Sequence, residues 1–120
     1  LPSLDPIRRF EEILENAEAI ADYIDGMDFA AYSTDRKTID AVERCLERIS
    51  EASRGLGSDA RNLAPEQPWR EIMDLGNALR HAYHKIRLSE IWEAVTRELP
   101  PLAEDARAAL DHLRQQSNKP

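Results

Sequence analysis

Two of the chain's three histidines, His81 and His84, lie close together in the stretch from Pro68 to Arg87. The stretch has helical spacing, and at about 100° per residue one stripe carries most of its polar side chains: Arg70, Asp74, Asn77, His81 and His84. Histidine titrates near neutral pH and transfers protons, whereas arginine binds phosphate oxygens through a planar fork of N–H donors. The stripe is therefore the part of the chain best suited to acid–base chemistry on a charged substrate.

The same stretch contains little negative charge. The chain as a whole has a net charge of −7, yet no carboxylate occurs from Gly76 to Leu88, where Arg80, Lys85 and Arg87 supply positive charge. An acidic chain argues against non-specific coating of nucleic acid, but it leaves room for a local phosphate-binding site. We therefore expect any anionic substrate to bind along this stretch.

A metal site is the competing interpretation of the two histidines. A protein metal site needs at least three ligands, and the nearest acid on the stripe is Asp74. Two histidines without a third strong ligand are a weak signal, and His84 taken alone is more often a solvated residue near a helix end. The chain also contains no glycine-rich phosphate loop and no pair of catalytic carboxylates. We therefore expect no metal and no cofactor.

Apolar residues recur at helical spacing along the chain, and no stretch alternates as a strand would. The expected starts of the long helices are Asp5-Pro6, Thr34 or Asp35, Pro68 and Ser89, where capping residues or prolines precede apolar runs. We expect Asp28 to cap a short turn that plugs the core with Phe29 and Tyr32, and Pro100-Pro101 to kink or break the last helix. The sequence predicts an all-α, antiparallel bundle of four to five helices.

The composition fits one helical domain over residues 1–120, with a frayed polar tail at 115–120. Hydrophobic residues make up 42% and charged residues 32%, and the mean hydropathy is −0.60, as amphipathic helices with charged outer faces require. The single cysteine, Cys45, cannot form an internal disulfide, and no apolar segment has the length of a membrane span. We expect a cytoplasmic protein.

Four segments together resemble one known family: 35–47 (DRKTIDAVERCLE), 68–72 (PWREI), 77–83 (NALRHAY) and 91–100 (IWEAVTRELP). In this order they are similar to the HepT-like proteins, small prokaryotic members of the HEPN superfamily. The resemblance implies a HEPN-like helical bundle that forms a homodimer and acts as the toxin of a toxin–antitoxin pair. It further implies a metal-independent endoribonuclease, neutralised by a minimal nucleotidyltransferase antitoxin that adds AMP to a tyrosine.

The family's motif consists of Arg, four residues, His, one residue and Tyr. His81 and Tyr83 match its last two places, and Asn77 matches the polar residue that commonly follows the Arg. The resemblance therefore makes His81 and Asn77 catalytic candidates and Tyr83 the site of AMPylation. With Arg80 as a third catalytic candidate, four further residues are expected to bind the RNA substrate: Arg70, His84, Lys85 and Arg87.

The motif's Arg is absent, because its place is occupied by Gly76. Loss of one donor that stabilises transition-state charge typically costs on the order of 10² to 10³ in rate. Arg80 lies about 40° from Gly76 on a helical wheel and is a candidate replacement, as are Arg70, Lys85 and a residue across the dimer interface. Gly76 then marks either a close helix crossing or a disarmed site, and in the second case Gly76→Arg should raise activity.

Two functions remain open. The first is a HepT-like ribonuclease toxin, attenuated because Gly76 replaces the motif Arg. The alternative is a catalytically silent HEPN-type binding module that still dimerises and engages a nucleotidyltransferase or RNA. A purely structural helical protein would leave the carboxylate-free stretch unexplained.

Overall fold

The computed structural model describes residues 5–118, apart from the side chain of Tyr83, and all regular structure in this part is helical. The long helices are α1 (Pro6–Tyr23), α3 (Arg36–Gly55), α5 (Trp69–His81) and α7 (Leu99–Ser117). Shorter elements connect them: α2 (Phe29–Ser33), α4 (Ser58–Arg61), the 3₁₀ turn η1 (Tyr83–Lys85), α6 (Leu88–Glu93) and the π-helical segment η2 (Ala94–Glu98). The predicted all-α class is confirmed.

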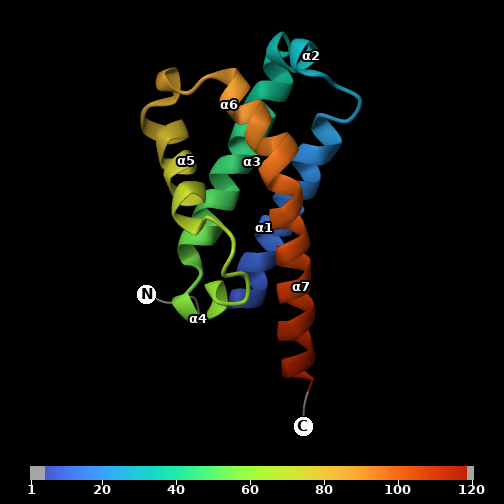
Figure 1. The fold of residues 1–120 in the computed structure, drawn as a ribbon, viewed down its shortest axis with the longest axis vertical. Coiled ribbons are helices and arrows are strands. Elements are labelled where there is room, and N and C mark those ends of the chain that lie inside the picture. The colour runs from blue at the N-terminus through green and yellow to red at the C-terminus, as the bar shows by residue number, and fades with distance from the viewer. Residues whose placement is uncertain (1–4, 119–120) are drawn as a thin grey trace.

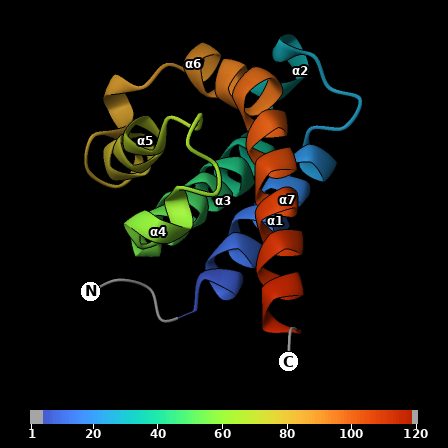
Figure 2. The ribbon, with the colours of Figure 1, turned by 60° about the horizontal axis from the view of Figure 1, so that its bottom comes forward.

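Helix α3 occupies the centre of the bundle. Figures 1 and 2 show α5 on one side of α3, with α1 and α7 together on the other, and successive long helices run antiparallel. The buried side chains of α1, α3 and α7 form the core, which includes Phe10, Ile13, Ile20, Val42, Ile49, Leu102 and Leu110. Helix α5 is thus held mainly by α3, and its opposite side faces outward.

Three aspartates cap helices: Asp5 and Asp28 as predicted, and Asp35 as one of the two predicted starts of its helix. The side chain of Asp5 accepts a hydrogen bond from the backbone N–H of Arg8 at 3.0 Å. Asp28 caps α2 and Asp35 caps α3 in the same way, at 2.8 and 3.1 Å. Each carboxylate satisfies one of the N–H groups that lack a partner in the first turn, and its negative charge lies at the positive end of the helix dipole.

The short helix α2 plugs one end of the bundle, as expected. Tyr32 is fully buried, and its ring centroid lies 5.1 Å from that of Trp92 on α6. Phe29 contacts the same indole at 6.4 Å but stays 39% exposed. The aromatic cluster of Phe29, Tyr32 and Trp92 therefore packs α6 against α2.

Helix α5 is shorter than the sequence predicts. It begins at Trp69, with Pro68 as the N-cap residue, and it ends at His81 instead of continuing to Arg87. Ala82 leaves the helical region at φ −148°, although its N–H still donates to the carbonyl of Ala78 at 2.7 Å. No glycine or proline marks this end, so the helix period alone could not reveal it.

The last helical stretch begins at Leu88, so the prediction of Ser89 as its N-cap is wrong. Pro100-Pro101 do not break it, because α6, η2 and α7 follow one another without a gap. Proline has no N–H to donate to the carbonyl four residues earlier. The residues before the prolines adopt π-helical bonding instead, with the Leu99 N–H donating to the carbonyl of Ala94, five residues back.

Helix α7 extends to Ser117 and so includes residues 115–117 of the predicted frayed tail, whereas residues 119–120 lie outside the described part. In the part of the chain that is described, no helix is both long and apolar enough to cross a membrane.

Candidate functional site

Trp69 anchors the beginning of α5. Its indole Nε1–H donates to the carbonyl of Ala64 at 3.0 Å, and its ring meets that of Phe10 edge to face, with centroids 6.5 Å apart. The side chain is 9% exposed. Trp69 is therefore a packing anchor that holds the beginning of α5 against the rest of the bundle.

The middle of α5 crosses α3 at Gly76. Gly76 is buried, and a Cβ at this position would overlap the Cβ and Oγ of Ser50 on α3. The Ser50 hydroxyl donates to the carbonyl of Met73 at 3.0 Å, which ties the two helices at the crossing. The close helix crossing expected as one explanation of Gly76 is therefore confirmed.

This crossing bears on the expectation that Gly76→Arg raises activity if the site is disarmed. Position 76 faces α3, so a side chain there would meet Ser50 and could not enter the exposed polar edge without moving α5. In this arrangement of helices the site must take its positive charge from other positions.

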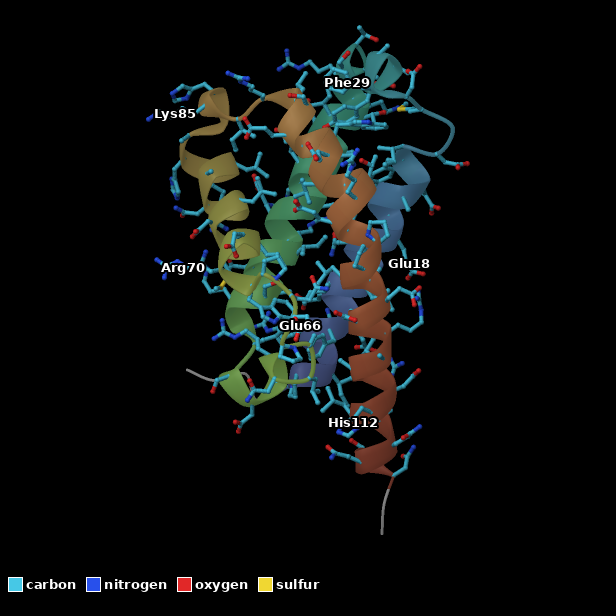
Figure 3. The ribbon with its side chains drawn as sticks, viewed as in Figure 1. Glu18, Phe29, Glu66, Arg70, Lys85 and His112 are labelled. Carbon is cyan, nitrogen blue, oxygen red and sulfur yellow. The ribbon has the colours of Figure 1, made fainter. Side chains whose placement is uncertain are left out.

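The outer side of α5 carries four members of the predicted polar stripe, with Arg80 beside them. We call this set the polar edge: Arg70, Asp74, Asn77, Arg80 and His81. All five residues are exposed. Asn77 and His81 are one helical turn apart and share a face, and Arg80 lies beside them in the last turn. Figure 3 shows Arg70 at the beginning of this side and Lys85 beyond its far end, both pointing away from the bundle. The end of α5 thus brings an amide, a guanidinium and an imidazole together.

Arg80 is held by a residue that no pattern in the sequence singles out. Its Nη1 lies 3.0 Å from Oε2 of Glu51 on α3, close enough for both an ion pair and a hydrogen bond. The stretch from Gly76 to Leu88 contains no carboxylate of its own, but the fold brings one to it. Glu51 and Arg80 are 29 residues apart on different helices, so only the tertiary structure reveals the pair.

The remaining candidates lie beyond the end of α5. His84 and Lys85 belong to η1, Arg87 precedes α6, and all three are exposed. The prediction that His84 continues the helical stripe of His81 is wrong, because α5 ends at His81. The side chain of Tyr83 lies outside the described part of the structure, so its predicted role is carried by the sequence alone.

The electrostatics of this region favour anions. Arg80 and His81 occupy the last turn of α5, where the negative end of the helix dipole stabilises positive charge. Lys85 and Arg87 follow within a few residues. Among the residues that the structure describes, no three His, Cys, Asp or Glu side chains are grouped so that they could hold a metal ion.

An apolar groove runs along the other exposed side of α5. Ile72 and Leu75 line it from α5, and Leu99 and Leu102 line it from α7. Ile72 and Leu75 are only half-buried. The groove and the polar edge thus lie on different sides of the same helix.

Comparison with known proteins identifies the family. The family model described as ribonuclease HepT-like matches residues 13–109. A probable ribonuclease HepT of Thermococcus cleftensis is 37% identical over 92 residues, covering 77% of this chain and 84% of the relative. A putative RNase of Methanocaldococcus jannaschii is 36% identical over 100 residues, covering 83% of each chain. A putative RNase of Caldanaerobacter subterraneus is 30% identical over 100 residues, covering 83% of this chain and 89% of the relative.

No solved structure matches the chain. The matched residues run from the middle of α1 to the second half of α7 and include the whole of α5 with its polar edge. The chain therefore belongs to the HepT-like ribonuclease family.

Proposed function

We propose that this protein is a metal-independent endoribonuclease and the toxin of a toxin–antitoxin pair. The observation that carries the proposal is the exposed end of α5, where Asn77, Arg80 and His81 lie together in a family of ribonucleases. RNA presents phosphates to these side chains, and the positive charge that follows along η1 extends the surface for its backbone.

Cleavage of RNA without a metal needs a group that transfers protons near neutral pH and a cation close to the charge that develops on the phosphate. His81 is the group that transfers protons during cleavage, and Arg80 stabilises the negative charge that develops on the phosphate. Asn77, one turn before His81, orients the substrate through its amide. Arg70, His84, Lys85 and Arg87 bind the phosphates on either side of the cleaved bond.

The activity is attenuated relative to family members that carry the motif Arg. Position 76 cannot supply a cation to the polar edge, because Gly76 is packed on Ser50. Arg80 replaces the missing side chain from one turn further along α5, and it does so while engaged with Glu51. A cation one turn away from the motif position stabilises the transition state less than a cation at the motif position itself.

The test is cleavage of a mixed RNA substrate by the purified protein in the presence of EDTA, compared with two histidine variants. His81→Ala should abolish cleavage. His112→Ala should leave it unchanged, since His112 is an exposed histidine on α7, far from α5 (Figure 3). A wild-type protein that leaves RNA intact, or a His81→Ala protein that cleaves at the wild-type rate, would contradict the proposal. Loss of cleavage on adding EDTA would contradict metal independence alone.

A catalytically silent binding module is the second candidate function. The observation that favours it is the combination of Gly76 at the motif position with an Arg80 already paired to Glu51. On this reading the protein binds RNA or a nucleotidyltransferase but does not cleave RNA. A protein that binds RNA without cleaving it, and whose RNA affinity is unchanged by His81→Ala, would support the binding module.

The protein acts as a homodimer in which the polar edge borders the two-fold axis, so that two His81 side chains face one cleft. Support comes from the half-buried apolar side chains of Ile72 and Leu75, which a second copy would cover. Its antitoxin is a minimal nucleotidyltransferase that transfers AMP to Tyr83. The cytoplasmic location expected from the cysteine content stays a prediction.

A further inference from the structure

We infer that Glu51 of α3 is a positioning residue for Arg80: its carboxylate holds the guanidinium at the His81 end of α5, ready to meet an RNA phosphate. The inference rests on the proposed ribonuclease function and adds to it a residue outside the motif. It assigns to α3 a part in the site that neither the helix period nor the motif spacing indicates.

The pair connects two helices and lies at the end of α5 that carries His81. Many ion pairs of the described residues join residues three or four apart within one helix, such as Arg44–Glu47. Glu51–Arg80 connects α3 to α5 at 3.0 Å with hydrogen-bond geometry. Arg114–Glu11 connects α7 to α1 in the same way at 2.8 Å, so the position of the Glu51–Arg80 pair, and not its geometry, carries the inference. The side chain of Arg80 is 33% exposed, so the guanidinium is kept against α3 while part of it still reaches solvent.

The helix crossing explains why this pair can form. Gly76 and Ser50 let the backbones of α5 and α3 approach closely. Glu51 directly follows Ser50, and Arg80 lies one turn after Gly76, so both charged side chains leave their helices beside the crossing. The glycine that removes the motif's cation from position 76 thus also brings Arg80 within reach of a carboxylate.

The pair leaves Arg80 able to bind phosphate. The contact with Glu51 uses Nη1, and a guanidinium carries five N–H donors in a fixed planar arrangement. One arginine can therefore bind a carboxylate on one side and a phosphate on the other. Because Glu51 holds the guanidinium in one orientation before the substrate arrives, less conformational freedom of Arg80 is lost on binding and in catalysis.

A purely structural role is the competing explanation. Exposed ion pairs typically contribute little to stability, and Glu51 is 58% exposed. If the pair were purely structural, the positive and negative residues could exchange positions without a change in activity. A positioning pair requires the positive charge to be on α5. This difference provides the decisive measurement.

The experiment is a double-variant cycle of Glu51→Gln and Arg80→Ala, with kcat and RNA affinity measured for each protein. Glu51→Gln should lower kcat about fivefold, the largest change that an exposed ion pair of this kind commonly supports. In the Arg80→Ala background the same substitution should have no further effect. The matched control is Glu18→Gln. Glu18 is 60% exposed, pairs with Arg107 between α1 and α7, and lies on the other side of the molecule (Figure 3).

Exchange of the two charges separates positioning from structure. The double variant Glu51→Arg with Arg80→Glu should regain the thermal stability of the wild type and yet remain as slow as Arg80→Ala. Recovery of wild-type kcat by the exchanged pair would overturn the inference. An unchanged kcat in Glu51→Gln would overturn the inference as well, because the carboxylate would then have no effect on catalysis. A raised kcat would also overturn it, because the carboxylate would then reduce the ability of Arg80 to bind phosphate.

RNA binding distinguishes failure of this inference from failure of the proposed function. If the wild-type protein does not cleave RNA, the ribonuclease proposal fails, and binding to 2′-O-methyl RNA decides the role of Glu51. Arg80→Ala should then weaken binding and reduce the slope of its salt dependence by about 1 when Glu51 is present, and have a smaller effect when residue 51 is Gln. An equal loss in both backgrounds, or no RNA binding at all, would overturn the inference.

Discussion

Gly76 of α5 lies so close to Ser50 of α3 that even a methyl group at position 76 would overlap the serine side chain. The contact ties the position where the family carries an arginine to the packing of the bundle. In this protein that position has become part of a helix crossing, with the Ser50 hydroxyl bonded to the carbonyl of Met73. We therefore expect substitutions at position 76 to affect the stability of the bundle.

We predict that Gly76→Ala destabilises the protein. Alanine favours a helix interior over glycine by roughly 1 kcal/mol, but forcing a methyl group into this contact costs about 1–3 kcal/mol. Urea unfolding should show a net loss of about 1 kcal/mol, and Gly76→Arg should lose more without gaining cleavage. Replacing Ser50 by glycine in the Gly76→Ala protein should restore part of the stability. A Gly76→Ala protein as stable as the wild type would show that the helices separate at no cost.

Tyr32→Phe is expected to stabilise the protein. The Tyr32 hydroxyl is buried without a hydrogen-bond partner among the described residues, and burial raises the pKa of the phenol above its ordinary value. A buried polar group without a partner typically costs about 1–3 kcal/mol. Removing the hydroxyl while keeping the ring that packs on Trp92 should raise the free energy of unfolding by about 1 kcal/mol. Calorimetry that shows a lower melting temperature for Tyr32→Phe would reveal a partner for the hydroxyl.

Glu43→Gln should stabilise the protein in a pH-dependent way. Burial, with the negative charges of Asp40 and Glu47, raises the pKa of Glu43 in the folded state above its ordinary value of 4.5. The ionised carboxylate is thus more costly in the folded than in the unfolded chain. That cost is fully present above the folded pKa and disappears as the pH falls below the unfolded pKa.

The glutamine variant should therefore be more stable than the wild type near pH 7, and the difference should fade below about pH 4.5. Urea unfolding at pH 7 and pH 4 measures both ends of this range. Glu15→Gln, at an exposed position of α1, serves as the control. A stability difference that grew as the pH fell would contradict the raised pKa.

Local signals in the sequence account for much of the fold. Asp5 and Asp28 cap helices as predicted, and Asp35 is the one of the two predicted starts, Thr34 or Asp35, that caps α3, because a capping aspartate acts within one turn of chain. The end of α5 at His81 carries no such signal. The chain leaves the helix there on its way to α6, which is fixed by the contact of Trp92 with Tyr32. A distant contact sets that boundary, so periodicity overextends the helix to Arg87.

The candidate site, too, has a part that the sequence predicts and a part that depends on contacts between helices. The exposed stripe with Asn77 and His81 follows from helix geometry, and the structure reproduces it. The Glu51–Arg80 pair and the Gly76–Ser50 contact each join two helices. Nothing in the order of the residues selects Glu51 among the chain's many surface acids. Such pairings depend on how α3 and α5 cross, which a single sequence does not specify.

The proposed homodimer should be detected by light scattering at micromolar concentration as twice the 13.7 kDa mass of one chain. Leu75→Glu should convert it to a folded monomer, because it places a charge in the apolar groove beside Glu71 and Glu98. Ala103→Glu, at a half-buried position in the hollow between α1 and α7, should remain dimeric. A monomeric wild-type protein would contradict the dimer, and a dimeric Leu75→Glu protein would place its interface elsewhere.

The last prediction concerns Tyr83, the first residue of η1. Lys85 and Arg87 follow it closely, and both are exposed. An AMP group on the Tyr83 hydroxyl would place a negative phosphate next to these cations. Bound there, the nucleotide would occupy positive charge that RNA phosphates need, and its bulk would cover the end of α5 at His81. AMPylation should therefore switch off RNA binding together with cleavage.

Mass spectrometry after co-expression with the cognate nucleotidyltransferase tests this prediction. The protein should gain the mass of one AMP per chain on the peptide that contains Tyr83, and lose RNA binding in proportion. Tyr83→Phe should remain unmodified and retain RNA binding. Tyr23→Phe is the control for non-specific transfer, because Tyr23 is 44% exposed and lies on α1. Transfer to Tyr23 at a comparable rate, or an unmodified Tyr83 beside an active partner enzyme, would exclude Tyr83 as the regulated residue.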